Sequence, residues 1–420
     1  MSRPYNFIDI FAGCGGLSEG FKKHGKYNML AAVEWEKPQV LNLINRLETK
    51  WGILDAKKRV MRFDIQRTNE LFEGWTDDKE YGSHPGLDKM INSNQLDLII
   101  GGPPCQAYSV AGRIRDVNGM RDDYRNYLFE SYLKIVNRYR PKLFVFENVP
   151  GMLSAKPGGI LVTDLIKKQI NDIGYEISED LRGSAQIDLT DYGVPQKRKR
   201  VIIVGIRKDK HLDAQSLLKN FYKAILPAFK EETRTVKDAI SDLPKLCPLD
   251  YDKIINTKKF SHQFNSSVPN HSPRFHNRRD ISTFELLAKD IETGNNLYVS
   301  TESLKQLYTK LTGRTSNIHK YHVLRWDKPS NTIPAHLYKD GLRHIHPDST
   351  QARSITVREA ARLQTFDDDY IFISSAGDNY KMIGNAVPPQ FSEKLALSLD
   401  ILLDSLRNDY IPDTVTALTN

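Results

Sequence analysis

The sequence is short of cysteine and of long apolar runs. Its 420 residues contain three cysteines, Cys14, Cys105 and Cys247, which are too few and too scattered for a disulfide framework and fit a reducing cytosol. They also exclude a zinc site built from cysteines, and we expect no bound metal. No apolar stretch approaches the roughly 20 residues that span a bilayer, and the N-terminus lacks the pattern of a signal peptide. We therefore expect a cytoplasmic protein with no membrane contact.

Positive charge is in excess, and most of the excess lies in one segment. Sixty Lys and Arg residues against 52 Asp and Glu residues give a net charge of +8. Residues 209–350 contain 22 basic and 16 acidic side chains, so +6 of the +8 lies there, together with nine of the 11 histidines. A basic segment of this kind suggests a polyanionic partner such as nucleic acid, although a merely solvated surface can carry the same charge.

Segments with strand and helix patterns alternate in the first half of the chain. The predicted strands are 5–11, 29–33, 96–100, 143–146 and 199–206, and the predicted helices are 17–23, 37–48 and 127–138. Such alternation predicts βαβ units and a parallel sheet. The alternation of strand and helix patterns ends after about residue 208, so we expect a separate, loop-rich domain there. Thr356 and Glu359 have the spacing of a capping box, and 391–406 is apolar at helical spacing and should pack back on the sheet.

A Gly-rich turn, Asp9 to Gly16, follows the first predicted strand. Glycines let a ligand approach the backbone, and a helix N-terminus favours a carboxylate or phosphate. The spacing is neither G-x-G-x-x-G nor that of a P-loop, and such turns are common in α/β proteins. Glu34, at the end of the second strand, strengthens the interpretation of this turn as a cofactor site, because its carboxylate can accept hydrogen bonds from both ribose hydroxyls. Trp35 beside it offers a face for adenine, or else packs in the core.

Cys105 lies in a second loop, 101–106, just past a strand end, where α/β folds place their ligands. A lone cysteine is a candidate nucleophile only if a neighbour activates it, and no histidine lies in a clear partner motif. The candidate partners are Glu147, at the end of another strand, and the basic run 196–200. Arginines near a thiol stabilise the thiolate, although a surface location is the commoner fate of such a run.

These segments, in this order, resemble the motifs of the cytosine-C5 DNA methyltransferases. The matching segments are 7–16 (FIDIFAGCGG), 103–106 (PPCQ), 147–149 (ENV), 196–200 (QKRKR), 353–364 (RSITVREAARLQ) and 384–389 (GNAVPP). The resemblance implies an α/β, Rossmann-like sheet that binds S-adenosylmethionine, with a smaller, loop-rich target-recognition domain. It implies a catalytic domain over 1–208, target recognition over 209–377, and a segment 378–420 that returns to the catalytic domain. The length resembles bacterial type II restriction-modification methylases, which protect host DNA from a cognate endonuclease.

The resemblance also carries roles to single residues. It implies that Cys105 is the nucleophile and that Glu147, Arg198 and Arg200 surround the cytosine. The implied cofactor contacts are Phe11, Cys14, Gly16, Glu34, Trp35, Asp64, Ile65, Pro104, Leu128, Asn385 and Val387. Gln106 and Ser109 would lie on a loop that closes over a base flipped out of double-stranded DNA. We expect a monomeric enzyme with S-adenosylmethionine as its cofactor.

The chemistry that this family performs explains the residue types. A Cys105 thiolate adds to C6 of cytosine, so that C5 can accept the methyl group. Glu147 hydrogen-bonds N3 as a general acid, and Arg198 holds the O2 side, while Arg200 orients Glu147 or the loop.

Three other interpretations stay open. RNA cytosine-C5 methyltransferases tend to carry Pro-Phe-Thr after Cys-Gln, where this chain has Ala107, Tyr108 and Ser109. An inactive protein that binds S-adenosylmethionine and DNA would not need Cys105 and Glu147 intact. A nucleotide-dependent oxidoreductase would share the Gly-rich turn but leave residues 103–106 and the basic segment unexplained.

Overall fold

The computed structural model describes residues 3–92, 94–103, 128–156, 159–209, 212–250, 260–263, 266–339 and 341–408. Its internal contacts divide the chain into two compact units. Unit 1 comprises 1–193, 198–232 and 386–420, and unit 2 comprises 194–197 and 233–385. Apart from 194–197, the second unit runs from 233 to 385, whereas the expected boundaries were 209 and 377. The target-recognition role expected for this part of the chain stays a prediction.

Unit 1 is built on one eight-stranded sheet. The order is β3-β2-β1-β6-β7-β10-β8, with β9 paired to β10. The strands are β1 (Tyr5–Ile10), β2 (Tyr27–Glu34), β3 (Val60–Arg62), β6 (Leu98–Gly101), β7 (Leu143–Asn148), β8 (Tyr175–Glu176), β9 (Gln186–Asp188) and β10 (Lys199–Arg207). The five strands from β3 to β7 run parallel, and β10 runs antiparallel to its neighbours β7, β8 and β9. The α/β class predicted from the alternating pattern is confirmed.

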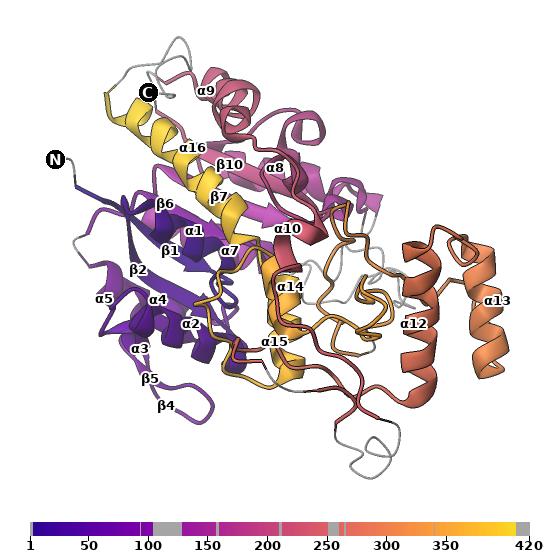
Figure 1. Cartoon of the computed structure of the whole chain (residues 1–420). Helices are drawn as coiled ribbons and strands as arrows, with labels where there is room; N and C mark the ends of the chain where they lie inside the picture. The colour runs from indigo at the N-terminus through magenta and orange to yellow at the C-terminus, as the bar shows by residue number, and fades with distance from the viewer. Residues whose placement is uncertain are drawn as a thin grey trace. The chain divides into compact units, whose positions relative to one another are not determined.

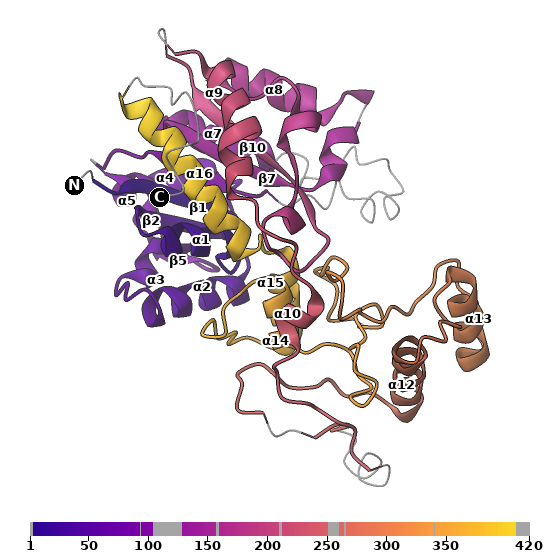
Figure 2. The same ribbon diagram turned by 45° about the horizontal axis from the view of Figure 1, so that its top comes forward.

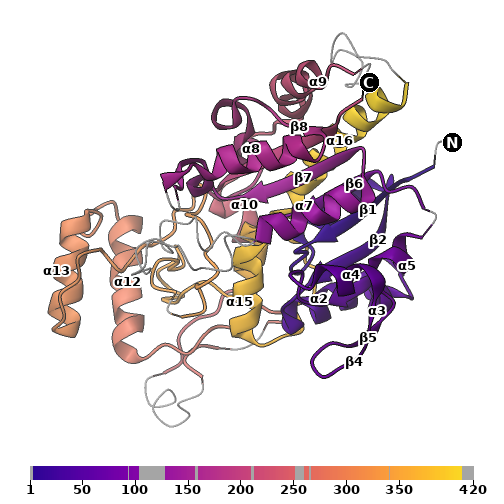
Figure 3. The same cartoon turned by 180° about the vertical axis from the view of Figure 1, so that it is seen from behind.

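Helices cover both faces of this sheet. The helices of unit 1 are α1 (Gly16–His24), α2 (Lys37–Thr49), α3 (Ala56–Arg59), α4 (Thr68–Glu73), α5 (Gly86–Ile91), α7 (Leu128–Tyr139), α8 (Val162–Asp172), α9 (Ala214–Asn220) and α16 (Pro389–Asn408). Figure 1 shows α16 crossing one face of the sheet beside α1, and Figure 3 shows α7 and α8 on the opposite face. Strands of this kind are buried on both faces: every residue of β1 and β6 is buried, and β6 is apolar throughout, whereas β1 also buries the polar residues Asn6 and Asp9. A short ribbon of β4 (Trp75–Asp78) and β5 (Gly82–His84) stands apart from the sheet.

The C-terminal helix packs closely on the first helix of the chain. Gly20 of α1 has no room for a side chain, because a Cβ atom there would overlap the backbone of Ser392 and Glu393 in α16. The Ser392 hydroxyl donates a hydrogen bond to the carbonyl of Leu17. The predicted return of this helix to the sheet is therefore confirmed. In the part of the chain that the structure describes, no helix is long and apolar enough to cross a membrane.

Unit 2 contains five helices within its described residues. They are α10 (Val236–Ile240), α12 (Arg278–Glu292), α13 (Thr301–Thr312), α14 (Val357–Leu363) and α15 (Ala376–Asn385). In Figure 2, α10, α14 and α15 lie together, while α12 and α13 form a second group. Phe284 and Leu287 of α12 share a core with Leu304 and Leu307 of α13. The sequence predicted a loop-rich region here and did not predict α12 or α13.

A buried ion pair lies at the centre of unit 2. The guanidinium of Arg353 donates two hydrogen bonds of 2.6 Å to the Glu359 carboxylate, and neither side chain is exposed to solvent. Glu359 also accepts the backbone N–H of Thr356, whose hydroxyl caps α14, so the predicted capping box is confirmed. Removing one partner of such a pair costs about 3–5 kcal/mol, because the other charge is left buried.

Unit 2 also buries several neutral histidines. Burial lowers the pKa of His276, His344 and His346 to about 3. An unfolded histidine titrates near 6.5, so the unfolded chain binds more protons than the folded one between these values. The stability that these buried histidines contribute is therefore present above pH 6.5 and is lost as the pH falls toward 3.

We predict that His346→Gln reduces this acid sensitivity. The wild-type free energy of unfolding should fall by several kcal/mol from pH 7 to pH 5, at about 1.4 kcal/mol per histidine and pH unit. The variant should lose one histidine's share of that fall, whereas His336→Gln, at an exposed position, should not. Urea unfolding followed by circular dichroism at both pH values measures the difference. An unchanged pH dependence in His346→Gln would contradict the assignment.

Candidate active site

The candidate site lies at one edge of the unit 1 sheet. The carboxyl ends of β1, β2, β6 and β7 meet there because these strands are parallel. β10 runs the opposite way, so its first residues, Lys199 and Arg200, arrive at the same edge. Loops from five strands thus converge.

The turn after β1 has a backbone that few side chains tolerate. Phe11, Gly13 and Gly15 have φ angles of 64°, 57° and 82°, in the left-handed region. For the non-glycine Phe11 this costs roughly 1–3 kcal/mol, and such strain clusters at ligand sites. The N–H of Ala12 donates to the carbonyl of Val33 (3.0 Å), which ties the turn to β2. The turn is therefore held in a shape that exposes its backbone to a ligand.

Gly16 brings this turn against the segment that returns to unit 1. A Cβ atom at Gly16 would overlap the carbonyl oxygen of Val387 and lie 2.9 Å from the Cβ of Ala386. Gly16 and Val387, both expected to contact the cofactor, are thus in direct contact. Asn385, another expected contact, is the last residue of unit 2.

The Glu34 carboxylate is oriented by backbone donors. Its Oε2 accepts the N–H of Gly13 at 2.9 Å, and its Oε1 accepts the N–H of Glu36 at 2.7 Å. Burial raises the pKa of Glu34 above its usual value, and these two hydrogen bonds oppose the shift. The remaining lone pairs of the carboxylate can accept a pair of vicinal hydroxyls.

Trp35 presents an open aromatic face next to this carboxylate. Its side chain is 49% exposed, which argues against core packing as its role. The guanidinium of Arg62 donates to the Trp35 carbonyl at 3.3 Å. Asp64 and Ile65 follow β3, with Ile65 buried and the Asp64 carboxylate capping the N–H of Gln66 at 3.0 Å.

Asp9 adds a second buried acid near the turn. Its carboxylate accepts a hydrogen bond from the Ser18 hydroxyl at the start of α1. Burial raises the pKa of Asp9 to about 7, and the nearby charge of Glu34 raises it further, while the Ser18 hydrogen bond lowers it. Two acids of this kind make the turn favourable for a cationic ligand. The sequence analysis did not assign Asp9 a role, because nothing in the motif indicates its pairing with Ser18.

Glu147 and Arg200 form an ion pair at the ends of β7 and β10. The Nε of Arg200 lies 2.8 Å from Oε1 of Glu147, and their side chains are 12% and 13% exposed. The antiparallel register pairs Ile202 with Glu147, so Arg200 extends just past the end of β7. The expectation that Arg200 orients Glu147 fits this contact.

The loop that leads to Cys105 starts against the same acid. A Cβ atom at Gly102 would lie 2.6 Å from Oε2 of Glu147, so a side chain at this position would require the Glu147 carboxylate to shift. Asn148, buried, donates to the carbonyl of Pro103 at 3.4 Å. The first residues of the loop are therefore fixed beside Glu147.

Arg198 is placed differently from Arg200. Its side chain is 1% exposed, and its guanidinium donates to the carbonyl of Ala386 at 2.9 Å. Arg198 thus holds the returning segment that contains Val387. The expected contact of Arg198 with a base stays a prediction.

The remaining predicted residues fall into two groups. Cys14 and Leu128 are buried in unit 1, at the Gly-rich turn and at the start of α7. Pro104, Cys105, Gln106 and Ser109 lie outside the residues that the structure describes. Their roles stay predictions.

Comparison of the sequence with known families finds one match. The model of the C-5 cytosine-specific DNA methylases matches residues 5–400. The chain is 34% identical to the type II methyltransferase M.Bpa9945I of Bacillus paralicheniformis, over 93% of this chain and 97% of that protein. It is 31% identical to the type II methyltransferase M.DdeI of Desulfomicrobium norvegicum, over 93% and 87% of the two chains.

Solved structures share the fold. A DNA modification methyltransferase encoded within an E. coli prophage aligns over 95% of this chain and 99% of its own, with a TM-score of 0.59 and 24% identity. The Dnmt2 methyltransferase of S. pombe aligns over 96% and 99%, with a TM-score of 0.54 and 13% identity.

We predict that Gly16→Ala destabilises unit 1. The added methyl group must displace the Val387 carbonyl, and overpacking of this kind costs about 1–3 kcal/mol. Gly377→Ala is the matched control, since its Cβ would meet no atom closer than 3.8 Å. Urea unfolding of both variants and the wild type measures the effect. Equal stability of Gly16→Ala and wild type would show that the turn and the returning segment are not in close contact.

Proposed function

The chain belongs to the C-5 cytosine-specific DNA methylase family and is a DNA (cytosine-5)-methyltransferase, and on this basis we propose that it methylates one cytosine within a specific duplex sequence. The observation that carries the proposal is the ion pair of Glu147 and Arg200 beside Gly102, at the root of the Cys105 loop. The match to DNA enzymes favours this function over RNA cytosine methylation.

Cys105 is the nucleophile of the proposed mechanism. Cys105 lies three positions after Gly102, so covalent geometry limits the distance between their Cα atoms to about 11 Å. Its thiolate is proposed to act on the same base as the Glu147 carboxyl. The thiolate forms a bond to C6 of cytosine, and the ring electrons move toward N3 and C5.

Glu147 acts on N3 of the cytosine ring. Carrying a proton, it donates a hydrogen bond to N3 and draws electron density from the ring as the thiolate adds. The contact with Arg200 fixes the carboxyl group in one orientation. Once C5 carries the methyl group, a water molecule accepts the C5 proton, the C5–H bonding electrons form the C5–C6 double bond, and the bond between C6 and the Cys105 sulfur breaks, which releases the thiolate.

We assign the O2 side of the base to Arg200 in preference to Arg198. Arg200 is partly exposed next to Glu147, whereas the guanidinium of Arg198 is buried against the Ala386 carbonyl. Arg198 would then act as a positioning residue that holds the returning segment.

S-adenosylmethionine, when bound, supplies the methyl group. Glu34 would accept its ribose hydroxyls, Trp35 would cover its adenine, and Asp64 would accept the adenine amine. Phe11, Gly16 and Val387 would surround the methionine end, and Asn385 is a further proposed cofactor contact. The strained turn and the two acids, Asp9 and Glu34, fit a ligand with a positively charged sulfur.

Double-stranded DNA is the proposed substrate, and unit 2 is proposed to recognise its sequence. C5 is inaccessible inside a duplex, so the base must leave the stack. The relatives' names support a place in a type II restriction-modification system, in which methylation would protect the host's own DNA in the cytoplasm.

We predict that Cys105→Ala abolishes covalent trapping. A duplex with 5-fluorocytosine at the target cannot lose its C5 substituent, so the wild type should form a complex that survives denaturation when S-adenosylmethionine is present. Cys247→Ala, at a cysteine of unit 2, should trap as the wild type does. The target sequence is first identified by bisulfite sequencing of DNA from cells that express the protein. Denaturing gel electrophoresis then measures the trapped complex of each variant. Trapping by Cys105→Ala would show that another residue is the nucleophile.

We also predict that Glu34→Ala weakens S-adenosylmethionine binding at least tenfold, because charge-assisted hydrogen bonds contribute about 1.5–3 kcal/mol. DNA binding without cofactor should be largely unchanged. Glu73→Ala, which removes an exposed acid at the end of α4, should change neither affinity. Isothermal titration calorimetry gives the cofactor affinity and gel shift the DNA affinity. An equal loss of both affinities would mean that Glu34 supports the fold and not the ligand.

A further inference from the structure

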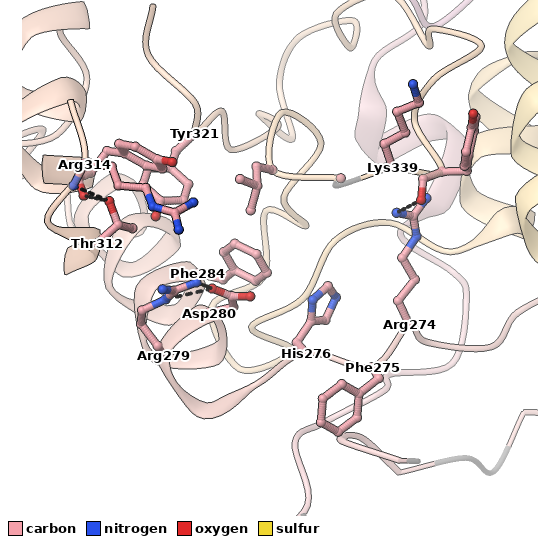
Figure 4. A pocket seen from close by; sticks show the side chains of 14 residues that line it. Arg274, Phe275, His276, Arg279, Asp280, Phe284, Thr312, Arg314, Tyr321 and Lys339 are labelled. Atoms are coloured by element: carbon pink, nitrogen blue, oxygen red, sulfur yellow. Dashed lines mark hydrogen bonds and ion pairs between the residues drawn. The ribbon is translucent and has the colours of Figure 1, made fainter. Parts of the chain in front are cut away.

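Unit 2 contains a pocket that the proposed methyl transfer does not use. Its volume is about 580 Å³, within the range of small-molecule sites. Residues from three stretches of chain line it, at 274–284, 308–321 and 338–342 (Figure 4). No residue of the candidate active site is among them. Any ligand of this pocket would therefore be distinct from the groups at the candidate active site.

The lining is strongly cationic. It contains Arg274, Arg279, Arg314 and Lys339 against a single acid, Asp280. Arg274 is already engaged, since it donates to the carbonyl of Leu337 at 2.7 Å. Its guanidinium therefore supports the loop that forms one wall.

Arg279 and Arg314 are available for an anion. Arg279 pairs with its sequence neighbour Asp280, at 3.0 Å and with half of its side chain exposed, and such pairs contribute little. Arg314 follows the left-handed cap of α13 and is exposed, and its guanidinium makes no ion pair within the described residues. Figure 4 shows both guanidinium groups on the same side of the pocket, near Phe284 and Tyr321.

Two further features favour an anion with an aromatic part. Arg279 and Asp280 stand in the first turn of the 15-residue helix α12, whose N-terminus carries a partial positive charge. The rings of Tyr308 and Tyr321 lie 6.0 Å apart in the wall. Inorganic phosphate would leave these rings uncovered. Aromatic rings next to arginines are the pattern that binds unstacked nucleotides.

We propose that this pocket binds one nucleotide, with its phosphate between Arg279 and Arg314 and its base against the aromatic wall at Tyr308. A volume of about 580 Å³ admits a single nucleotide and not a duplex. The source is either an unstacked nucleotide of DNA or a free nucleoside monophosphate. The proposal goes beyond the methyl transfer, because it adds a second nucleotide site to the chain.

The test is a titration of the full chain with the four deoxynucleoside 5′-monophosphates. S-adenosylhomocysteine is present in saturating amount, so that the cofactor's adenine site is filled. At least one monophosphate should bind ten times more tightly than its nucleoside and than inorganic phosphate. Arg314→Gln should weaken that binding about tenfold through loss of a charged contact. Arg343→Gln, which removes an exposed arginine of unit 2 outside the pocket, should not change it.

A second variant tests the aromatic wall. Tyr308→Leu should weaken the monophosphate and leave inorganic phosphate unchanged. If an oligonucleotide displaces the monophosphate, the natural ligand is a nucleotide of DNA. If it does not, the natural ligand is a free nucleotide. Either result supports the proposal that the pocket binds a nucleotide. No monophosphate binding, or equal binding by wild type and Arg314→Gln, would overturn it. Trapping at Cys105 is measured in parallel, so a failure of the methyltransferase mechanism is seen separately.

Discussion

The reversed direction of one strand determines where the chemistry of this enzyme lies. Were β10 parallel to β7, its first residues would emerge at the far edge of the sheet, and Glu147 would face no arginine. Because β10 is antiparallel, Arg200 meets Glu147 at 2.8 Å on the edge that also holds the Gly-rich turn. The residues proposed for cofactor binding and for proton transfer are thereby brought to the same edge of one sheet.

The motif at 353–364 has a structural explanation that its resemblance to the family does not supply. Arg353 and Glu359 form the buried pair of unit 2, and Thr356 caps the helix between them. Arg358 donates to three backbone carbonyls, those of Pro269, Asp367 and Tyr370. Each of these side chains holds unit 2 together, and none requires contact with a ligand to account for its type.

Secondary-structure features that depend on neighbouring residues could be predicted from the sequence. Features that depend on packing between distant segments could not. The strand at β1 and the capping box at Thr356 follow from neighbouring residues alone. The helix α12 escaped prediction because its apolar positions, such as Phe284 and Leu287, stand in a stretch rich in charged and polar residues, and they acquire their meaning only through packing with α13. At the candidate site, the motifs indicated which residues to expect. They could not indicate that Asp9 pairs with Ser18, because this contact forms only when α1 packs on β1.

The close contact between α1 and α16 has a consequence for synthesis of the chain. Gly20 and Leu17 leave the ribosome long before the helix that covers them, because the whole of unit 2 is made in between. At about 5–20 residues per second, this face of α1 waits tens of seconds for its partner. The segment at Val387, which packs against Gly16 in the Gly-rich turn, arrives equally late. A nascent chain therefore exposes this face of α1 and one side of the turn until the residues that follow unit 2 have been made.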